Sequence, residues 1–225
     1  MPDPLPRIHH QKEDRAKLNG QIRVGVYAGT FAPVHNGHIA AAKAFIQQMQ
    51  LDILYVIPAA IPPHKQIDAA DDPNHRYRMC ELAFWDEEKV LVSDMEIQRG
   101  GKSYTVDTLR ELSAPDRRLF LLMGTDMMLT LDTWYQSDEI FKLCYPIYAR
   151  REKDPILEAR IIAKNNEYLA KYGKIVRRLM LDTVELASTD IRALVEKGEP
   201  ISHLVPPAVE RYIKKHGLYG AEAEK

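Results

Sequence analysis

The sequence predicts an α/β fold in which helices cover both faces of a doubly wound parallel sheet. Short apolar runs of strand length alternate along the chain with longer segments of helical periodicity, a pattern typical of βαβ units. The run at residues 51–57 is almost wholly apolar, as expected for a central strand that is covered on both faces. Ligands bind at the carboxyl ends of such strands, so we expect functional residues directly after Tyr27, Ile57, Met123 and Leu186.

The first half of the chain supplies three predicted strands and two predicted helices. β-branched and aromatic residues from Ile22 onward indicate a strand that ends at Gly29, and the Ala-rich segment after it has the apolar rhythm of a helix. Pro58 ends the next apolar run. In chain order we predict a strand at 22–29, a helix at 37–50, a strand at 51–57, a helix from about 73 and a strand at 90–92.

The second half continues the alternation and ends in helices. Asp154 is a helix N-cap, Pro155 occupies the first helical position, and Gly173 ends that helix. In chain order we predict a helix at 103–113, a strand at 119–123, helical structure from about 126, a strand at 145–149, a helix at 155–173, an extended stretch at 176–186, and helices at 188–198 and 206–217.

Length and charge indicate one domain that does not bind nucleic acid. At about 150 residues per domain, the 225 residues fit one large domain, which we place at 21–220. Residues 1–20 read as a polar leader that we expect to be poorly ordered, with a partner-binding role left open, and 221–225 as a polar tail. The 31 basic and 32 acidic residues give a net charge of −1, whereas nucleic-acid binding normally requires a basic excess.

Hydropathy and cysteine content indicate a cytoplasmic protein without a membrane partner. No stretch approaches the ~20 apolar residues that span a bilayer, and the leader lacks the apolar core of a secretory signal. Cys80 and Cys144 form no Cys-x-x-Cys pair, so we expect buried free thiols rather than a disulfide framework or a zinc site. The oligomeric state stays open, with a homodimer among the options.

A glycine turn and two histidines follow the first predicted strand, in the segment Gly29-Thr30-Phe31-Ala32-Pro33-Val34-His35-Asn36-Gly37-His38. Glycine lets the backbone approach a ligand closely, and a helix start offers unpaired N–H groups to a phosphate. The imidazoles of His35 and His38 can donate hydrogen bonds to phosphoryl oxygens as charge develops. A His-x-x-His pair alone is a weak signal, which leaves metal ligation and a structural pair open.

Together with the preceding Gly-Thr-Phe-x-Pro, the segment resembles the signature of the (H/T)-x-G-H nucleotidyltransferase superfamily, here His35-Asn36-Gly37-His38. Within that superfamily the chain is similar to the bacterial nicotinate mononucleotide adenylyltransferases, from about Ile22 to Tyr219. The resemblance implies a Rossmann-like nucleotidyltransferase fold. It also implies transfer of the adenylyl group of ATP to nicotinate mononucleotide, giving deamido-NAD and pyrophosphate in NAD biosynthesis. Mg²⁺ is then expected on the ATP phosphates, with no metal held by protein side chains.

The resemblance also implies roles for individual residues. Three are expected to be catalytic, namely His35, His38 and Arg192. Eight are expected to contact ATP and its phosphates, namely Gly29, Thr30, Phe31, Lys65, Gly124, Asp126, Ser188 and Thr189. Four are expected to contact the nicotinate ring and its carboxylate, namely Tyr104, Thr105, Trp134 and Tyr135.

Most of these segments also have plainer interpretations. Pro62-Pro63-His64-Lys65 reads as a rigid turn with solvated charges. Ser103 and Ser188 each read as part of an ordinary helix cap, and Trp134 as a core residue. The segment Arg76-x-x-Met79 is expected only to pack as one face of a helix.

The chain departs from the pattern of the family at two positions. Ala28 stands where a second glycine is usual, and Ala32 stands where an aspartate is usual. The lost carboxylate keeps open a nucleotide-binding paralogue that has lost catalysis. Two more functions stay open, namely a related nucleotidyltransferase that uses nicotinamide mononucleotide or phosphopantetheine, and a metalloprotein built on the two histidines, which lacks a third ligand nearby in the sequence.

Overall fold

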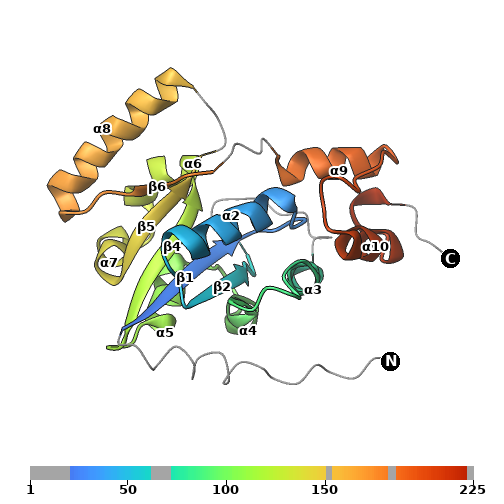
Figure 1. The fold of residues 1–225 in the computed structure, drawn as a ribbon, viewed down its shortest axis with the longest axis horizontal. Coiled ribbons are helices and arrows are strands. Elements are labelled where there is room, and N and C mark those ends of the chain that lie inside the picture. The colour runs from blue at the N-terminus through green and yellow to red at the C-terminus, as the bar shows by residue number, and fades with distance from the viewer. Residues whose placement is uncertain (1–20, 62–71, 151–153, 182–185, 222–225) are drawn as a thin grey trace.

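A computed structural model describes residues 21–61, 72–150, 154–181 and 186–221 (Figure 1). Its strands are β1 (Ile22–Gly29), β2 (Ile53–Pro58), β3 (Val90–Val92), β4 (Arg117–Gly124), β5 (Cys144–Ala149) and β6 (Arg177–Leu179). They form a six-stranded sheet in the order β3-β2-β1-β4-β5-β6, and each neighbouring pair is parallel. Connections run outward in both directions from the β1–β4 pair, which is the switch point of a doubly wound sheet. The predicted fold class is confirmed.

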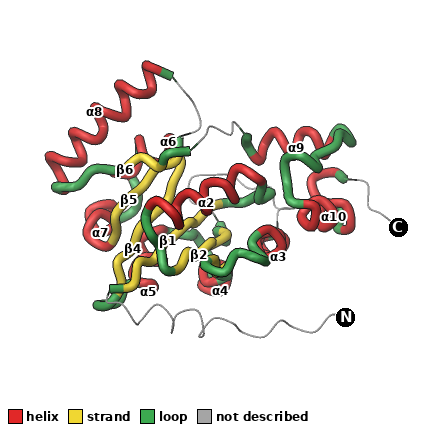
Figure 2. The backbone as a smooth tube through the Cα atoms, viewed as in Figure 1, coloured by secondary structure: helices red, strands yellow, loops and turns green. Residues whose placement is uncertain are grey.

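Helices connect the strands and cover both faces of the sheet (Figure 2). In chain order they are α2 (Asn36–Gln48), α3 (Pro73–Ala83), α4 (Met95–Arg99), α5 (Thr105–Leu112), α6 (Thr125–Leu129), the 3₁₀ turn η2 (Leu131–Thr133), α7 (Ser137–Leu143), α8 (Pro155–Tyr172), α9 (Ser188–Glu196), α10 (Pro207–Lys215) and the 3₁₀ turn η3 (Leu218–Gly220).

The hydrophobic core is divided by the sheet into two clusters. Along β4, Phe120 and Leu122 face one cluster while Leu121 and Met123 face the other, as the two-residue period of a strand requires. The first cluster is completed by α2, α3, α9 and α10, and the second by α5, α6, α7 and α8. Burial on both faces explains why the central strands read as continuous apolar runs.

Three local predictions differ from the structure. The second strand begins at Ile53 rather than Leu51, because the Leu51 amide donates to the Ile46 carbonyl at the end of α2. The extended stretch predicted at 176–186 is a strand only at Arg177–Leu179, and 182–185 lie outside the described residues. Helix α4 was not predicted, because its single turn without a side-chain cap is too short to give a periodic signal.

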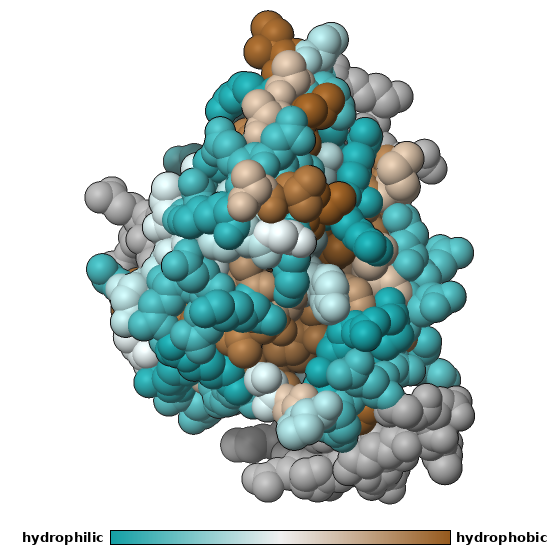
Figure 3. All heavy atoms as spheres, turned by 90° about the vertical axis from the view of Figure 1, so that its left-hand side faces the viewer, coloured by the Kyte–Doolittle hydropathy of each residue, from teal (hydrophilic) through white to brown (hydrophobic). Residues whose placement is uncertain are grey.

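The surface of α8 carries several apolar side chains. Ile156, Ile162 and Leu169 are more than half exposed, and brown patches stand out among the teal side chains in Figure 3, which views the left-hand side of Figure 1.

Within the described ranges, none of the helices combines the length and the apolar content that crossing a membrane requires.

Gly25 lies in β1 at a position that leaves no room for a side chain. An added Cβ would stand 2.4 Å from Leu51 Cδ1, 2.8 Å from Leu54 Cδ1 and 3.0 Å from Phe45 Cε1, all in fully buried side chains. We therefore expect Gly25→Ala to lower the free energy of unfolding by about 1–3 kcal/mol, the usual cost of overpacking. Urea denaturation measures the difference.

Gly124→Ala is the matched control, since a Cβ there meets nothing within 4 Å. Unchanged stability in Gly25→Ala would mean that the two leucines repack without cost, contrary to the expected strain.

Candidate active site

The loop after β1 is buried and backbone-strained. Phe31 has a positive φ of 51°, unusual for an aromatic residue, and only 2 % of its surface is exposed. An added Cβ at Gly29 would stand 3.2 Å from the Phe31 ring, so this glycine makes room for Phe31. Ala28 lies within β1 and is not among the residues with positive φ, so alanine replaces the family's second glycine without strain. The peptide bond between Ala32 and Pro33 is cis.

His35 and His38 form a stacked, buried pair at the N-terminus of α2. Their ring centroids lie 3.7 Å apart, and the exposed fractions are 1 % and 9 %. The His35 amide donates to Nδ1 of His38, and the His38 amide donates to Nδ1 of His35, each at 3.3 Å. Since each Nδ1 accepts a hydrogen bond, both rings are neutral tautomers with the proton on Nε2. Two histidines thus form a capping box, a motif that serine or threonine and glutamate or glutamine more often make.

Three side chains from distant helices hold carbonyl groups of the same loop. Arg76 of α3 donates to Thr30 O at 2.8 Å. Ser188 Oγ of α9 donates to Pro33 O at 2.9 Å, and Arg192 of α9 donates to Ala32 O at 2.7 Å. The structure therefore brings the predicted Ser188 and Arg192 to the histidine loop.

Arg76 is the residue that sequence reasoning missed, since it was expected only to pack. Its side chain is fully buried, and its Nη2 also donates to Ala60 O at 3.2 Å. An arginine on the apolar face of a helix, in register with Met79, is the signal that could have identified it.

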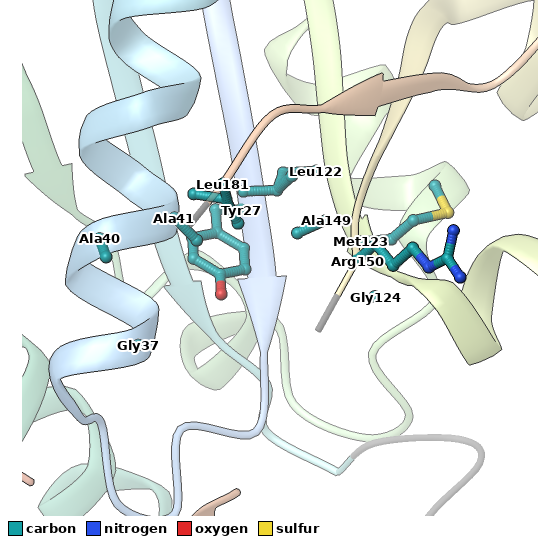
Figure 4. Close-up of a pocket in the computed structure, with 10 residues that line it drawn as sticks. All are labelled: Tyr27, Gly37, Ala40, Ala41, Leu122, Met123, Gly124, Ala149, Arg150 and Leu181. Atoms are coloured by element: carbon teal, nitrogen blue, oxygen red, sulfur yellow. The ribbon is translucent and has the colours of Figure 1, made fainter. Parts of the chain in front are cut away.

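A cavity of about 50 Å³ opens beside the histidine loop, at the carboxyl ends of β1, β4 and β5. It spans the switch point, as Figure 4 shows, between the first turns of α2 and the end of β5. Its lining consists of Tyr27, Gly37, Ala40, Ala41, Leu122, Met123, Gly124, Ala149, Arg150 and Leu181. Gly124 is thus where the sequence placed it, whereas Asp126 follows it in α6 as an exposed residue outside the lining.

The residues predicted for the nicotinate ring come from two segments that meet. The Tyr104 and Tyr135 rings lie 4.7 Å apart, centroid to centroid, and Tyr135 is 52 % exposed. Trp134 is partly buried against the second core cluster, and it also lines an open hollow with residues 136–139 and Lys142. Its position is intermediate between a core residue and a ligand-facing one. Thr105 begins α5 directly after Tyr104.

Ser103 does not cap α5 as its plainer interpretation suggested. Helix α5 begins at Thr105 without a side-chain cap, and Ser103 Oγ instead accepts a hydrogen bond from the Ala60 amide at 2.9 Å. Nearby, Glu96 is 2 % exposed and accepts a 2.6 Å hydrogen bond from Thr108 Oγ1. Burial raises the pKa of Glu96, while the hydroxyls of Thr108 and Ser103 act against that rise.

The remaining candidates divide into described and undescribed residues. Thr189 is exposed in the first turn of α9, and Lys65 lies outside the described residues together with the rest of 62–71. Among the described side chains, no group of three or more His, Cys, Asp or Glu could hold a metal ion. Cys80 and Cys144 are buried free thiols, as expected, and burial raises the pKa of Cys144 to about 12.

The sequence matches a known family along most of its length. A family model described as cytidylyltransferase-like matches residues 26–194. A protein of a Synechococcus species named probable nicotinate-nucleotide adenylyltransferase is 40 % identical over 204 residues, which cover 88 % of this chain and 95 % of that protein. A protein of the same name from a Thermoanaerobacter species is 36 % identical over 211 residues, covering 92 % and 99 %.

The fold matches solved structures at much lower identity. The nicotinic acid mononucleotide adenylyltransferase of Plasmodium falciparum, solved in complex with NaAD, has a TM-score of 0.65 and 15 % identity, and the match covers 91 % of this chain and all of that one. A putative nicotinate-nucleotide adenylyltransferase from Vibrio parahaemolyticus has a TM-score of 0.60 and 17 % identity, covering 90 % and 98 %. At such identities the likeness supports the fold.

Proposed function

The chain belongs to the cytidylyltransferase-like family and, within it, to the nicotinate-nucleotide adenylyltransferases, and we propose that its site transfers the adenylyl group of ATP to nicotinate mononucleotide. A phosphate oxygen of the mononucleotide attacks the α-phosphorus of ATP. The new P–O bond replaces the bond to the β-phosphate, and pyrophosphate leaves with the bonding electrons. The product is deamido-NAD, an intermediate of NAD biosynthesis.

This chemistry requires positioning and charge stabilisation rather than a general base. The attacking phosphate oxygen is already ionised at neutral pH, so no side chain has to remove a proton from it. The site must hold two anions in line and stabilise the charge that builds up on the transferred phosphoryl group. Donors fixed before the substrates arrive are effective because they need no reorganisation during the reaction.

The histidine pair is the observation that carries the proposal. His35 and His38 use both Nδ1 atoms to cap α2, which fixes the proton of each neutral ring on Nε2. The two N–H donors of fixed direction lie beside the amides and the positive dipole end of α2, with Nε2 of His35 buried. We assign the α-phosphate of ATP to this group of donors.

The rest of the site suggests how the two substrates are arranged. We assign the adenosine of ATP to the side of the cavity at the ends of β4 and β5, next to Gly124, with Asp126 reaching the ribose from α6. The aromatic pair Tyr104 and Tyr135, with Trp134 beside it, suits a flat pyridine ring, because stacked rings attract each other beyond their buried area. Thr105 and the first amides of α5 face its carboxylate in this arrangement.

Mg²⁺ enters this proposal with the substrate. The described residues offer no cluster of metal-ligating side chains, and Mg²⁺ typically binds through substrate phosphates with few protein ligands. When bound, the ion neutralises part of the phosphate charge.

The proposal is tested by measuring pyrophosphate release from MgATP with three acceptors in parallel: nicotinate mononucleotide, nicotinamide mononucleotide and phosphopantetheine. We expect turnover with the nicotinate compound. Turnover with phosphopantetheine alone would contradict the proposal. A preference for nicotinamide mononucleotide would mean that adenylyl transfer to a pyridine mononucleotide is right and that the choice of the nicotinate form is wrong.

The same assay decides whether Ala32 has silenced the site. Ala32 is 4 % exposed, and its backbone carbonyl accepts a hydrogen bond from Arg192, so the loop is tied to α9 through a group that does not depend on the side chain at position 32. We expect the wild-type chain to be active and Ala32→Asp to change turnover only modestly. An inactive wild type beside an active Ala32→Asp variant would support the paralogue that has lost catalysis.

A further inference from the structure

Two loops of the site are joined by one buried side chain. The loop after β1 carries the histidine signature, and residues 59–61 follow the neighbouring strand β2. The fully buried Arg76 guanidinium lies between these loops, with Nη1 donating to Thr30 O at 2.8 Å and Nη2 donating to Ala60 O at 3.2 Å. A planar guanidinium can hold two acceptors at a fixed separation, which a lysine ammonium on a flexible stem cannot do.

The connection continues from the β2 loop to the start of α5. The Ala60 amide donates to Ser103 Oγ at 2.9 Å, and the Ser103 amide donates to Ile61 O at 3.0 Å. Ser103 is 7 % exposed and directly precedes Tyr104 and Thr105. Hydrogen bonds therefore run without interruption from Thr30, through Arg76, Ala60 and Ser103, to the aromatic side of the site.

Burying the guanidinium of Arg76 carries a desolvation cost. A guanidinium loses its hydration when it is buried, and its hydrogen bonds offset this loss only where the acceptors lie in well-defined positions. An apolar residue in register with Met79 would pack on the sheet without that cost. Holding Thr30 O and Ala60 O together is a positional role that an apolar side chain could not fill.

We infer that Arg76 and Ser103 are positioning residues that set the separation between the phosphate-binding loop and the nicotinate-binding helix start. The inference rests on the proposed function, because it concerns the two substrates assigned to those elements. In-line transfer requires the reacting atoms to lie about 3–3.5 Å apart, and a misplacement of 1 Å can cost about 10²-fold in rate. Each substrate is held by its own element, so loss of the connection affects their relative placement more than the binding of either one.

The test combines Arg76→Lys and Ser103→Ala with two matched controls. Arg78→Lys changes an exposed arginine of the same helix that pairs with Glu81. Ser113→Ala changes an exposed serine at the other end of α5. We expect kcat to fall about 10- to 100-fold in Arg76→Lys, with the KM of each substrate within about threefold of the wild type and both controls unchanged. The double variant is expected to lose less than the product of the two single losses, because both cut one connection.

Hydrogen exchange supplies a second readout that needs no substrate. Ser103→Ala is expected to speed amide exchange not only near Ala60 but also at Phe31, Ala32 and Val34, on the far side of Arg76. A purely structural role would lower the melting temperature while leaving kcat of the folded enzyme unchanged, which would overturn the inference. So would faster exchange confined to the neighbourhood of Ser103. An inactive wild type would refute the proposed function, and the exchange result would still decide whether the connection exists.

Discussion

Replacement of His38 by asparagine is expected to lower kcat by about 10²- to 10³-fold while the protein stays folded, the typical loss for one preorganised donor. The ring of His38 has two tasks that different atoms perform. Nδ1 accepts the His35 amide and completes the cap of α2, whereas Nε2 carries the proton that we assign to the phosphoryl group. Asparagine places an acceptor near the position of Nδ1 and has nothing at the position of Nε2.

Glutamine at the same position is the matched comparison, because its terminal amide lies near the position of Nε2. We expect His38→Gln to keep more activity than His38→Asn, although its cap is poorer. Single-turnover rates and urea denaturation of both variants separate the two tasks. If activity instead follows stability across the pair, capping is the whole role of His38, and the donor must be sought elsewhere.

The places of the histidine loop and of Gly124 could be predicted because the rule for parallel sheets depends only on recognising strands, whereas the roles of the individual residues came from the resemblance. Strands leave a local signal in the apolar runs, and the ends of β1 and β4 lead directly to the histidine loop and to Gly124. The rule cannot be applied directly at Leu186, because β6 ends at Leu179 and residues 182–185 lie outside the described residues. Ser188 and Arg192 nevertheless reach the loop, since the start of α9 packs beside it.

The roles of Arg76 and Ser103 could not be predicted from local patterns. Arg76 binds carbonyls 46 and 16 residues earlier in the chain, and Ser103 accepts from an amide 43 residues earlier. Such partners become neighbours only when β1 and β2 pair and α3 packs on them. A helical face pattern reports that a residue is buried, and it does not report which backbone groups the residue will meet.

Lysine is not expected to substitute for Arg192 in the reaction. Its Nη1 donates to Ala32 O at 2.7 Å, and a guanidinium has five N–H donors, so others remain to face a phosphate. Lysine keeps the charge but cannot hold the loop carbonyl and a phosphate in one plane. Hydrogen bonds to charged groups contribute about 1.5–3 kcal/mol, so we expect kcat/KM for ATP to fall about 10- to 100-fold in Arg192→Lys. Arg211→Lys, at an exposed position of α10, is the control.

The observed contact of Arg192 with Ala32 and its proposed contact with an ATP phosphate predict different kinetic results. If it only holds the loop, Arg192→Lys lowers kcat and leaves the KM of both substrates unchanged. If it also clamps ATP, as we expect, the KM of ATP rises while that of nicotinate mononucleotide does not. Full activity in the lysine variant would mean that one positive charge near Ala32 is sufficient, and that the planar geometry of Arg192 contributes nothing to the reaction.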